Sequence, residues 1–365
     1  IVPIKELSYI MGNPPFIGKN YRSEEQDVGM QTTFTTAAHL EPVKLYKSLD
    51  FVAAWYYRAT DYLQKNKTMR VAFVSTNSVT QGEQVSILWP PLINAGLKIH
   101  FAHRTFSWSS EARGKAAVHV VIIGFSLAEI SEKNLFVYDS IKGEPHSTTA
   151  KNINPYLIDA PNTIIDSRSK PICKVPEIYK GSQPTDGGYL LFSEAEKVTF
   201  LNQDPAASVW LKPFVGAEEF INRISRWCLW LKGISPAELK QHPLILERVN
   251  KVRNSRLESS KEATRKWADY PTLFTEDRQP ASEYLLIPSV SSENRKYIPI
   301  GFFEPNVVAS NLVLVVPNAT LYHFGVLTSN MHNSWTRVVA GRLKSDYRYS
   351  AKLVFNNFPW PENPT

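Results

Sequence analysis

The sequence predicts an α/β fold in its first part, followed by a mixed α+β region and a helical C-terminal segment. Strand-length apolar runs alternate with stripes of helical spacing between residues 45 and 125. From about residue 152 the sequence becomes proline-rich, with short strand-like runs and dense turns. We therefore expect a largely parallel first sheet with helices on both faces, and ligand binding at the carboxyl ends of its strands.

The first part divides into elements by its apolar pattern. The apolar run at 7–12 predicts a strand, and an apolar stripe predicts a helix within 45–65. A buried strand is expected at 71–76, followed by a helix over 83–95 that Pro90-Pro91 interrupts. Two further strands are expected at 97–102 and 118–125.

The second part carries weaker signals. Residues 181–188 predict a turn-dense loop, and two helical stretches are expected between 217 and 270. The second stretch carries a run of cations that favours a solvated helix face; its members are Lys251, Arg253, Arg256, Lys261, Arg265 and Lys266. Strands are expected at 284–287 and 312–316, and then a helix from Tyr322 that ends in the basic, aromatic segment 341–349.

Composition restricts the class of protein. The 365 residues, with 43% hydrophobic and 21% charged, suit a folded protein with more than one core. The 41 Lys and Arg against 34 Asp and Glu give a net charge of +7, which suits a polyanion such as nucleic acid. No apolar stretch approaches the ~20 residues of a membrane span, no signal peptide is recognised, and a reducing cytosol is the expected location.

Cysteine and histidine give no metal or disulfide pattern. Cys173 and Cys228 are far apart and belong to no Cys/His cluster, so neither a disulfide framework nor a zinc site is expected. The eight histidines include no pair at metal-ligand spacing, and His119, inside an apolar strand, is expected to be a core residue. We expect no metal.

The tetrapeptide Asn13-Pro14-Pro15-Phe16, directly after the first strand, is the most informative motif. Proline has no N–H and a fixed φ, so the turn is stiff and rich in acceptors. The Asn13 side-chain carbonyl and the Pro14 carbonyl can accept both hydrogens of an exocyclic amine such as adenine N6, while Phe16 stacks on the extruded base. The alternative is a rigid strand-to-loop turn without chemistry.

Several segments, in one order, resemble the MmeI-type (type IIL) adenine-specific restriction-modification enzymes, in which one polypeptide carries nuclease, methyltransferase and target-recognition parts. The resemblance runs almost end to end. The segments that carry it are Asn13-Pro14-Pro15-Phe16, Phe106-Ser107-Trp108, residues 117–122, 181–188, 291–299 and 324–350, and Phe358-Pro359-Trp360-Pro361.

The resemblance implies a gamma-class DNA methyltransferase that transfers methyl from S-adenosylmethionine to N6 of a flipped adenine. The fold would be part of a class I (Rossmann-like) sheet, a mixed α+β target-recognition domain and a helical C-terminal segment. We expect the C-terminal half of the catalytic domain at 1–150, the target-recognition domain at 151–318, and a helical DNA-contacting segment at 319–365. The sequence starts at the catalytic turn, so the cofactor-binding motif and any upstream nuclease are absent and a fragment is expected.

The resemblance also implies residues that contact double-stranded DNA. Family members read a base pair with the residues that match Glu293 and Arg295; an arginine can bond a guanine edge while a carboxylate accepts from cytosine N4. An exposed i,i+2 pair is the alternative. Arg342, Lys344 and Arg348 are candidates for phosphate contact, with Tyr347 and Tyr349 interleaved for stacking, and helix capping or surface solvation is the alternative for them.

Two functions from different classes therefore stay open. The first is the catalytic and recognition half of an adenine methyltransferase that is inactive as an isolated piece. The second is a DNA sequence-recognition module with no activity of its own, and affinity for S-adenosylmethionine would separate the two. An N4-cytosine methyltransferase is a third reading, against which Asn13 and the family resemblance favour adenine. The sequence leaves open whether the full-length polypeptide also cuts DNA.

Overall fold

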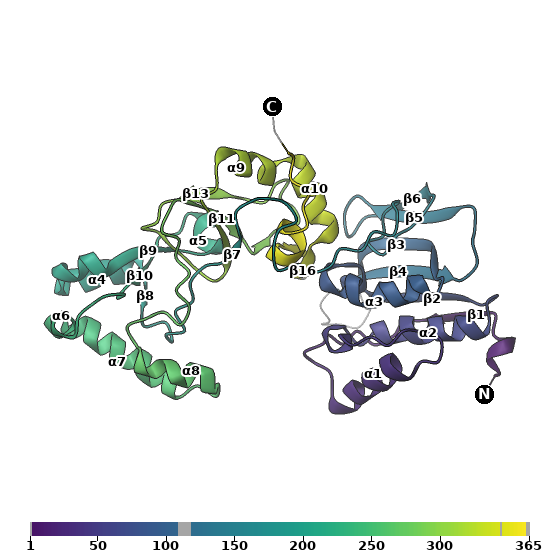
Figure 1. Cartoon of the computed structure of the whole chain (residues 1–365), viewed down its shortest axis with the longest axis horizontal. Helices are drawn as coiled ribbons and strands as arrows, with labels where there is room; N and C mark the ends of the chain where they lie inside the picture. Colours follow the sequence, from purple (N-terminus) through teal and green to yellow (C-terminus); the bar gives the residue numbers. More distant parts are fainter. Residues whose placement is uncertain (1, 109–117, 344, 363–365) are drawn as a thin grey trace. The chain divides into compact units, whose positions relative to one another are not determined.

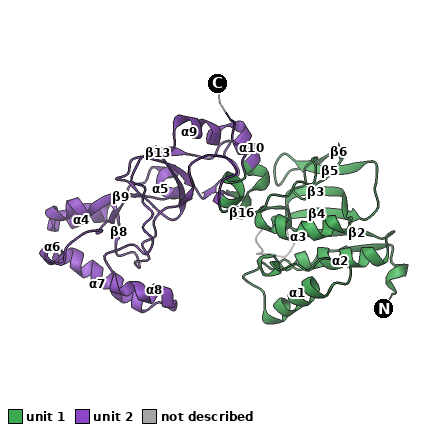
Figure 2. Ribbon diagram, viewed as in Figure 1, with its two compact units in different colours: residues 1–169, 336–347, 352–357 green, residues 170–335, 348–351, 358–365 purple. Residues whose placement is uncertain are grey.

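The computed structural model describes residues 2–108, 118–343 and 345–362. The chain folds into two compact units (Figure 2). Unit 1 comprises residues 1–169, 336–347 and 352–357, and unit 2 comprises residues 170–335, 348–351 and 358–365. Unit 1 is therefore discontinuous in sequence, because the chain leaves it after residue 169 and returns to it near the carboxyl end.

Unit 1 is built on a six-stranded sheet with strand order β1-β2-β4-β3-β5-β6 (Figure 1). Its strands are β1 (Tyr9–Gly12), β2 (Arg70–Thr76), β3 (Lys98–Trp108), β4 (Val118–Ser126), β5 (Lys133–Tyr138) and β6 (Pro145–Ala150). Its helices are η1 (Ile4–Glu6), α1 (Glu24–Thr36), η2 (Tyr46–Ser48), α2 (Ala53–Lys65), η3 (Asn77–Thr80) and α3 (Gly82–Asn94). The expected α/β class is confirmed.

The strand directions correct the expectation of a largely parallel sheet. β1 pairs with β2, and β3 with β5, in parallel, whereas β4 lies between β2 and β3 and is antiparallel to both. β6 is antiparallel to β5. Consecutive strands can pair in antiparallel through a short connection, whereas parallel strands need a crossover, and apolar runs do not distinguish the two. β1, β2, β3 and β5 still point in one direction.

The helices α2 and α3 cover one face of the sheet, not both faces as expected. Tyr56 of α2 contacts the rings of Phe73 in β2, Phe125 in β4 and Trp89 in α3. α1 packs against α2, where Phe34 contacts Tyr57. Successive right-handed crossovers that move across a sheet in one direction place their helices on the same face, which explains the arrangement.

Helix α3 continues through its two prolines, contrary to the expected interruption. Pro90 and Pro91 remove backbone donors, but Leu88, Trp89 and Leu92 are buried in the same turns. The Trp89 indole N–H donates to the Val79 carbonyl at 2.7 Å. Packing of this helix face therefore outweighs the lost helical hydrogen bonds.

Unit 2 is a mixed α+β region, as expected, with two four-stranded sheets of order β14-β9-β10-β8 and β13-β11-β15-β7. Its strands are β7 (Tyr179–Lys180), β8 (Leu191–Ser193), β9 (Leu211–Val215), β10 (Arg226–Leu229), β11 (Tyr284–Pro288), β12 (Val290–Ser291), β13 (Gly301–Phe303), β14 (Val308–Ala309) and β15 (Val313–Pro317). Its helices are α4 (Glu194–Gln203), η4 (Pro205–Trp210), α5 (Ala217–Asn222), α6 (Pro236–Gln241), α7 (Pro243–Leu257), α8 (Glu262–Lys266), η5 (Trp267–Asp269) and α9 (Leu321–Thr328). Residues 217–270 thus form more helices than the two stretches expected.

The run of cations that includes α7 was expected to form a solvated helix face, and Arg256 contradicts this. The side chains of Lys251 and Arg253 are exposed, but Arg256 is only 1% exposed. Its guanidinium donates to five main-chain carbonyls, which belong to Pro184, Thr185, Trp267, Tyr270 and Leu273. Burial lowers the pKa of this guanidinium. One side chain thus ties the loop at 181–188 to α7 and η5.

The same loop is held at its start by a close approach of two backbones. A Cβ on Gly181 would lie 2.4 Å from the Ser310 carbonyl oxygen, so only glycine fits there. The Ser182 N–H donates to the Ala309 carbonyl at 2.7 Å. The turn-dense loop predicted from the sequence is therefore an ordered part of unit 2.

The carboxyl end returns to unit 1 after α10 (Asn330–Val339). It forms β16 (Gly341–Leu343), β17 (Asp346–Arg348) and the π-helical turn η6 (Ala351–Phe355). The Asn357 side-chain amide donates to the carbonyls of Asp166, Lys352 and Leu353, and its oxygen accepts from Arg168 Nε at 2.8 Å. The segment after unit 1 and the segment that returns to it are thus bonded together.

Two further expectations concern covalent and membrane features. Cys173 and Cys228 are both free thiols, which confirms that they form no disulfide. In the part of the chain that the structure describes, every helix is too short or too polar to cross a bilayer.

Arg256 leads to a prediction for stability. Arg256→Met should lower the free energy of unfolding by about 3 kcal/mol or more, since it leaves buried carbonyls without donors. Urea denaturation followed by circular dichroism measures the change. Arg253→Met, one helical turn earlier on the exposed side of α7, should stay within about 0.5 kcal/mol of the wild type. Equal effects of the two substitutions would contradict the assigned role.

Candidate functional site

The turn Asn13–Phe16 follows β1 directly and lies at the carboxyl edge of the six-stranded sheet, as predicted. Pro14 is buried, Asn13 and Pro15 are exposed, and Phe16 is partly exposed. The Ile17 N–H donates to the Pro15 carbonyl at 3.2 Å, and the Ile17 carbonyl accepts from the Phe51 N–H at 2.9 Å. The turn is therefore fixed against the start of α2.

Two acceptors of this turn stay available. Among the residues that the structure describes, none donates a hydrogen bond to the Asn13 side chain or to the Pro14 carbonyl. The turn thus presents two oxygen acceptors that local structure does not use. This is the arrangement that an amine with two hydrogens requires.

Contacts from α3 and from the loop before α2 support the turn. Asp50 Oδ1 accepts from the Lys19 N–H at 3.0 Å, and the Asp50 N–H donates to Gln84 Oε1 at 3.0 Å. The buried Arg22 guanidinium donates to the Leu49 and Lys47 carbonyls. Residues 17–22 and 47–51 are thereby held together, so Phe16 is carried on a rigid segment.

An aromatic cluster lies farther along the same edge, on β3 and β5. The His103 ring stacks on Phe136 at 4.1 Å, and its Nδ1 hydrogen-bonds to the Tyr138 hydroxyl at 2.8 Å. Phe106 stacks on Tyr138 at 5.0 Å, and Trp108 is 39% exposed. Burial lowers the pKa of His103, which favours the neutral ring. The sequence analysis assigned this cluster no role. The alternating aromatic residues at the carboxyl end of the strand could have indicated it.

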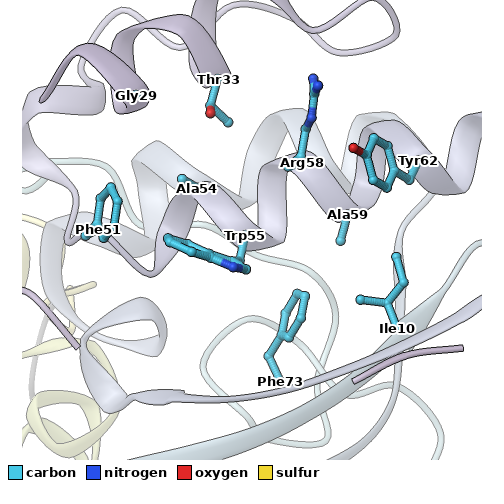
Figure 3. A pocket seen from close by; sticks show the side chains of 10 residues that line it. All are labelled: Ile10, Gly29, Thr33, Phe51, Ala54, Trp55, Arg58, Ala59, Tyr62 and Phe73. Atoms are coloured by element: carbon cyan, nitrogen blue, oxygen red, sulfur yellow. The ribbon is translucent and has the colours of Figure 1, made fainter. Parts of the chain in front are cut away.

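A largely apolar pocket of about 340 Å³ lies between α1, α2 and the first two strands (Figure 3). Ile10 of β1 and Phe73 of β2 form one side, and Trp55 and Tyr62 of α2 form another. Gly29 and Thr33 of α1 complete it. The pocket holds no carboxylate or histidine and suits apolar side chains more than a catalytic reaction.

Glu293 and Arg295 lie in unit 2, on a turn that follows β12 and not on a strand. The Arg295 N–H donates to the Ser292 carbonyl at 3.1 Å, which closes the turn. Arg295 is exposed and Glu293 partly exposed. The neighbouring chain is fixed from two sides: the Tyr349 N–H donates to the Ser289 carbonyl at 2.9 Å, and Asn333 Oδ1 accepts from the Ile298 N–H.

The three backbone-contact candidates fall in different places. Arg342 belongs to unit 1, where its guanidinium lies 3.7 Å from the centre of the Tyr347 ring. Arg348 belongs to unit 2 and is exposed. Lys344 lies outside the described residues. In unit 2 the Tyr349–Ser289 bond brings the segment of Arg348 alongside β12, and so close to the turn of Glu293 and Arg295.

Of the two tyrosines expected to stack, Tyr349 is only 3% exposed and is too buried to do so. The Tyr347 ring is half-buried and has the Arg342 guanidinium over it. The Tyr349 hydroxyl hydrogen-bonds to His332 Nε2 at 2.8 Å inside unit 2. The segment is a strand pair followed by a buried anchor, not a flexible basic helix end.

No group of three or more potential metal ligands occurs among the described residues. His119, expected in the core, is only half-buried and lies at the beginning of β4.

Comparison with known proteins decides the family. A family profile described as "MmeI, DNA-methyltransferase domain" matches residues 3–137, and one described as "MmeI, target recognition domain" matches residues 159–362. The chain belongs to the MmeI family. The family resemblance found in the sequence is therefore confirmed.

A curated family relative and a solved structure support the assignment. "DNA methyltransferase A" of Bacillus subtilis (strain 168) is 42% identical over 361 residues, which are 99% of this chain and 40% of that protein. The structure of the type IIL restriction-modification enzyme MmeI in complex with DNA is 50% identical, with a TM-score of 0.90 over 99% of this chain and 47% of that one. The chain thus spans less than half the length of these two relatives.

His332 leads to a prediction for the pH dependence of folding. Burial lowers its pKa to about 3 from an ordinary 6.5, so the unfolded chain binds this proton more readily than the folded chain. The stability due to the neutral ring is complete above pH 6.5 and falls as the pH drops towards 3, by about 1.4 kcal/mol per pH unit. In His332→Gln this part of the acid sensitivity should be absent, as measured by urea unfolding between pH 7 and pH 4.

The control is His146→Gln, which removes a solvent-exposed histidine of β6. It should leave the pH profile of stability as in the wild type. An unchanged slope in His332→Gln would show that other groups cause the acid sensitivity.

Proposed function

We propose that the chain is the catalytic and target-recognition half of a single-chain restriction-modification enzyme that methylates adenine N6 in double-stranded DNA. The observation that carries this proposal is the Asn13–Phe16 turn at the carboxyl end of β1, with two acceptors that no described residue uses. Membership of a family with methyltransferase and target-recognition domains supports it. Its place would be the bacterial cytoplasm, where such DNA is found.

The turn would act on an adenine that has left the helix. The Asn13 side-chain oxygen and the Pro14 carbonyl accept the two amino hydrogens, which draws the nitrogen lone pair out of conjugation with the ring. Phe16 stacks on the base and holds it in place. S-adenosylmethionine, when bound, supplies the methyl group.

The residues present do not complete a site for that cofactor. The sequence has no glycine-rich strand-loop-helix segment of the kind that holds S-adenosylmethionine in this fold. We therefore derive no step through the cofactor, and we propose that a cofactor-binding region and a nuclease region of the same polypeptide act with this chain. The greater length of its relatives supports that proposal.

The free edge of β1 is where such a region would join. Among the described strands β1 has one neighbour, β2, so its other edge has unpaired backbone groups. Tyr9 and Met11 on this strand are 62% and 78% exposed. The apolar pocket beside Ile10 gives a second surface for side chains of the same region. An added strand would pair this edge and cover these residues.

Sequence recognition would belong to unit 2. We propose that Arg295 bonds a guanine edge and Glu293 accepts from cytosine N4 of the same pair. The exposed turn that carries them can enter a groove without a change in the sheets. Arg342, Lys344 and Arg348 would contact phosphates, which fixes the position of the protein on DNA and reads no sequence.

A DNA-recognition module without activity is the second candidate. The missing glycine-rich segment favours it for the chain in isolation. Under this description the turn would still bind an extruded base, but the rest of the chemistry would belong to other regions of the polypeptide.

Asn13 gives the direct test of catalysis. In the full-length polypeptide, Asn13→Ala should lower the methylation rate by about 100- to 1000-fold, because the lost acceptor acts mainly in the transition state. The affinity for the target duplex should change less than threefold. Transfer of tritiated methyl groups gives the rate, and fluorescence anisotropy gives the affinity.

Asn20→Ala is the matched control, since Asn20 is an exposed asparagine of the same loop. It should methylate at the wild-type rate. Near-normal methylation by Asn13→Ala would show that Asn13 is not a catalytic residue.

Glu293 and Arg295 give the test of specificity. The exchange Glu293→Lys with Arg295→Asp inverts the pattern of donor and acceptor, so the preferred base pair should change at one position of the site. A good bidentate contact discriminates by ~1–3 kcal/mol, enough to appear in sequencing of methylated sites.

A charge exchange elsewhere on unit 2 is the control. Arg278 and Glu276 form an exposed ion pair at 3.0 Å, and Glu276→Lys with Arg278→Asp should leave the methylated motif unchanged. If the Glu293/Arg295 variant methylates the same motif as the wild type, or loses specificity at every position, the two residues do not read a base pair and are only an exposed surface pair.

A further inference from the structure

Arg104 of unit 1 has a position that the proposed function does not explain. It lies in the carboxyl half of β3, where the register with β4 shifts between His103 and Phe106. Such a bulge turns a side chain away from the direction that regular alternation would give it. Arg104 is half-buried, and no carboxylate among the described residues lies within ion-pair distance of it.

Arg342 of the same unit is held in a fixed orientation. Its guanidinium stacks on Tyr347 at 3.7 Å, and it donates to the Ser345 and Arg337 carbonyls at 3.0 and 3.2 Å. Among the described residues, no Asp or Glu lies within ion-pair distance of this guanidinium. Arg342 is therefore a positioned cation whose charge no carboxylate neutralises.

The strand that carries Arg342 packs at the carboxyl edge of the sheet. β16 contacts α3, the helix that begins just after β2 ends (Figure 1). A Cβ on Gly82, where φ is +58°, would lie 3.2 Å from Gly341 Cα, so the two backbones touch. β2 pairs with β1, and the Asn13 turn follows β1 at this same edge.

The two guanidiniums lie close enough to affect each other. The pKa of Arg104 is lowered, first by burial and then by the positive charge of Arg342, while Tyr347 acts in the opposite direction. Two like charges that are partly removed from water disfavour each other, and an anion placed between them would offset that cost. The arrangement therefore has the properties of an anion site.

We propose that Arg104 and Arg342 together bind one phosphate of the DNA strand that carries the extruded adenine. This inference rests on the proposed function, and it assigns Arg104, which no sequence pattern indicated. Guanidinium groups match phosphate oxygens in geometry, and two of them can hold one phosphate from two sides.

Spacing supports a phosphate near the extruded base. Three strand spacings separate β1 from β3 in the order β1-β2-β4-β3, which is about 14 Å at the usual strand distance. A few nucleotides span this distance at about 3.4 Å of rise each. The phosphate would fix the strand next to the site while Phe16 holds the base.

The test maps the phosphate in the full-length polypeptide. Target duplexes that carry one neutral methylphosphonate, moved position by position around the target adenine, are compared by fluorescence anisotropy. The wild type should lose about 10- to 100-fold in affinity at one position. In Arg104→Gln, and in Arg342→Gln, the same neutral position should cause a smaller loss than in the wild type, because one arginine remains, and in the double variant it should cause no further loss. Each single variant should weaken binding to the unmodified duplex.

Charge and geometry are separated by further variants. Arg104→Gln with Arg342→Gln should lower the slope of log K against log salt by about 0.9, the value for one phosphate. Arg70→Gln removes an exposed cation from the opposite end of β2 and should leave both the slope and the phosphate map unchanged. Arg104→Lys should keep the slope and lose part of the affinity.

Each remaining result contradicts the inference. If the wild type shows no sensitive position, or if that position is as sensitive in either single glutamine variant as in the wild type, the two arginines do not share a phosphate. If the variants lose affinity for S-adenosylmethionine and not for DNA, the anion is the cofactor carboxylate. Absence of DNA binding by the wild type would instead refute the proposed function, so failure of this inference can be distinguished from failure of the proposed function.

Discussion

The closure of unit 1 by its last segment is the constraint on which the rest of the structure depends. Asn357 bonds to carbonyls at 166 and 352–353, Asn356 donates to the Arg168 carbonyl, and the Arg168 N–H donates to the Lys352 carbonyl. These bonds join the chain where it leaves unit 1 to the chain where it comes back. The same returning chain carries β16, which contacts α3 and bears Arg342.

Strand direction is the second constraint, and it explains why residues distant in sequence gather at one edge. β1, β2 and β3 point the same way although β4 separates the last two. Their carboxyl ends therefore carry the Asn13 turn, the start of α3 and the Arg104 bulge along one line. The sheet supplies geometry, while the chemistry is in the segments that follow each strand.

Apolar periodicity predicted α2, β2, α3 and β4 closely, since burial against one core imposes a period on each of them. It could not predict the antiparallel insertion of β4, because a strand pattern carries no direction. It also could not identify Arg256, whose partners are main-chain carbonyls from two segments, 184–185 and 267–273. The motif at Asn13 was visible because its chemistry is contiguous, whereas Arg104 acquires a neighbour only after the chain has folded.

The discontinuity of unit 1 has a consequence for synthesis on the ribosome. Residues 352–357 emerge after residues 170–335 of unit 2, so unit 1 lacks its last segment while most of unit 2 is translated. At about 5 to 20 residues per second this interval is roughly 10 to 40 seconds. A chain terminated early would carry the Asn13 turn but not the strand that bears Arg342. Completion of unit 1 is thereby coupled to translation of most of unit 2.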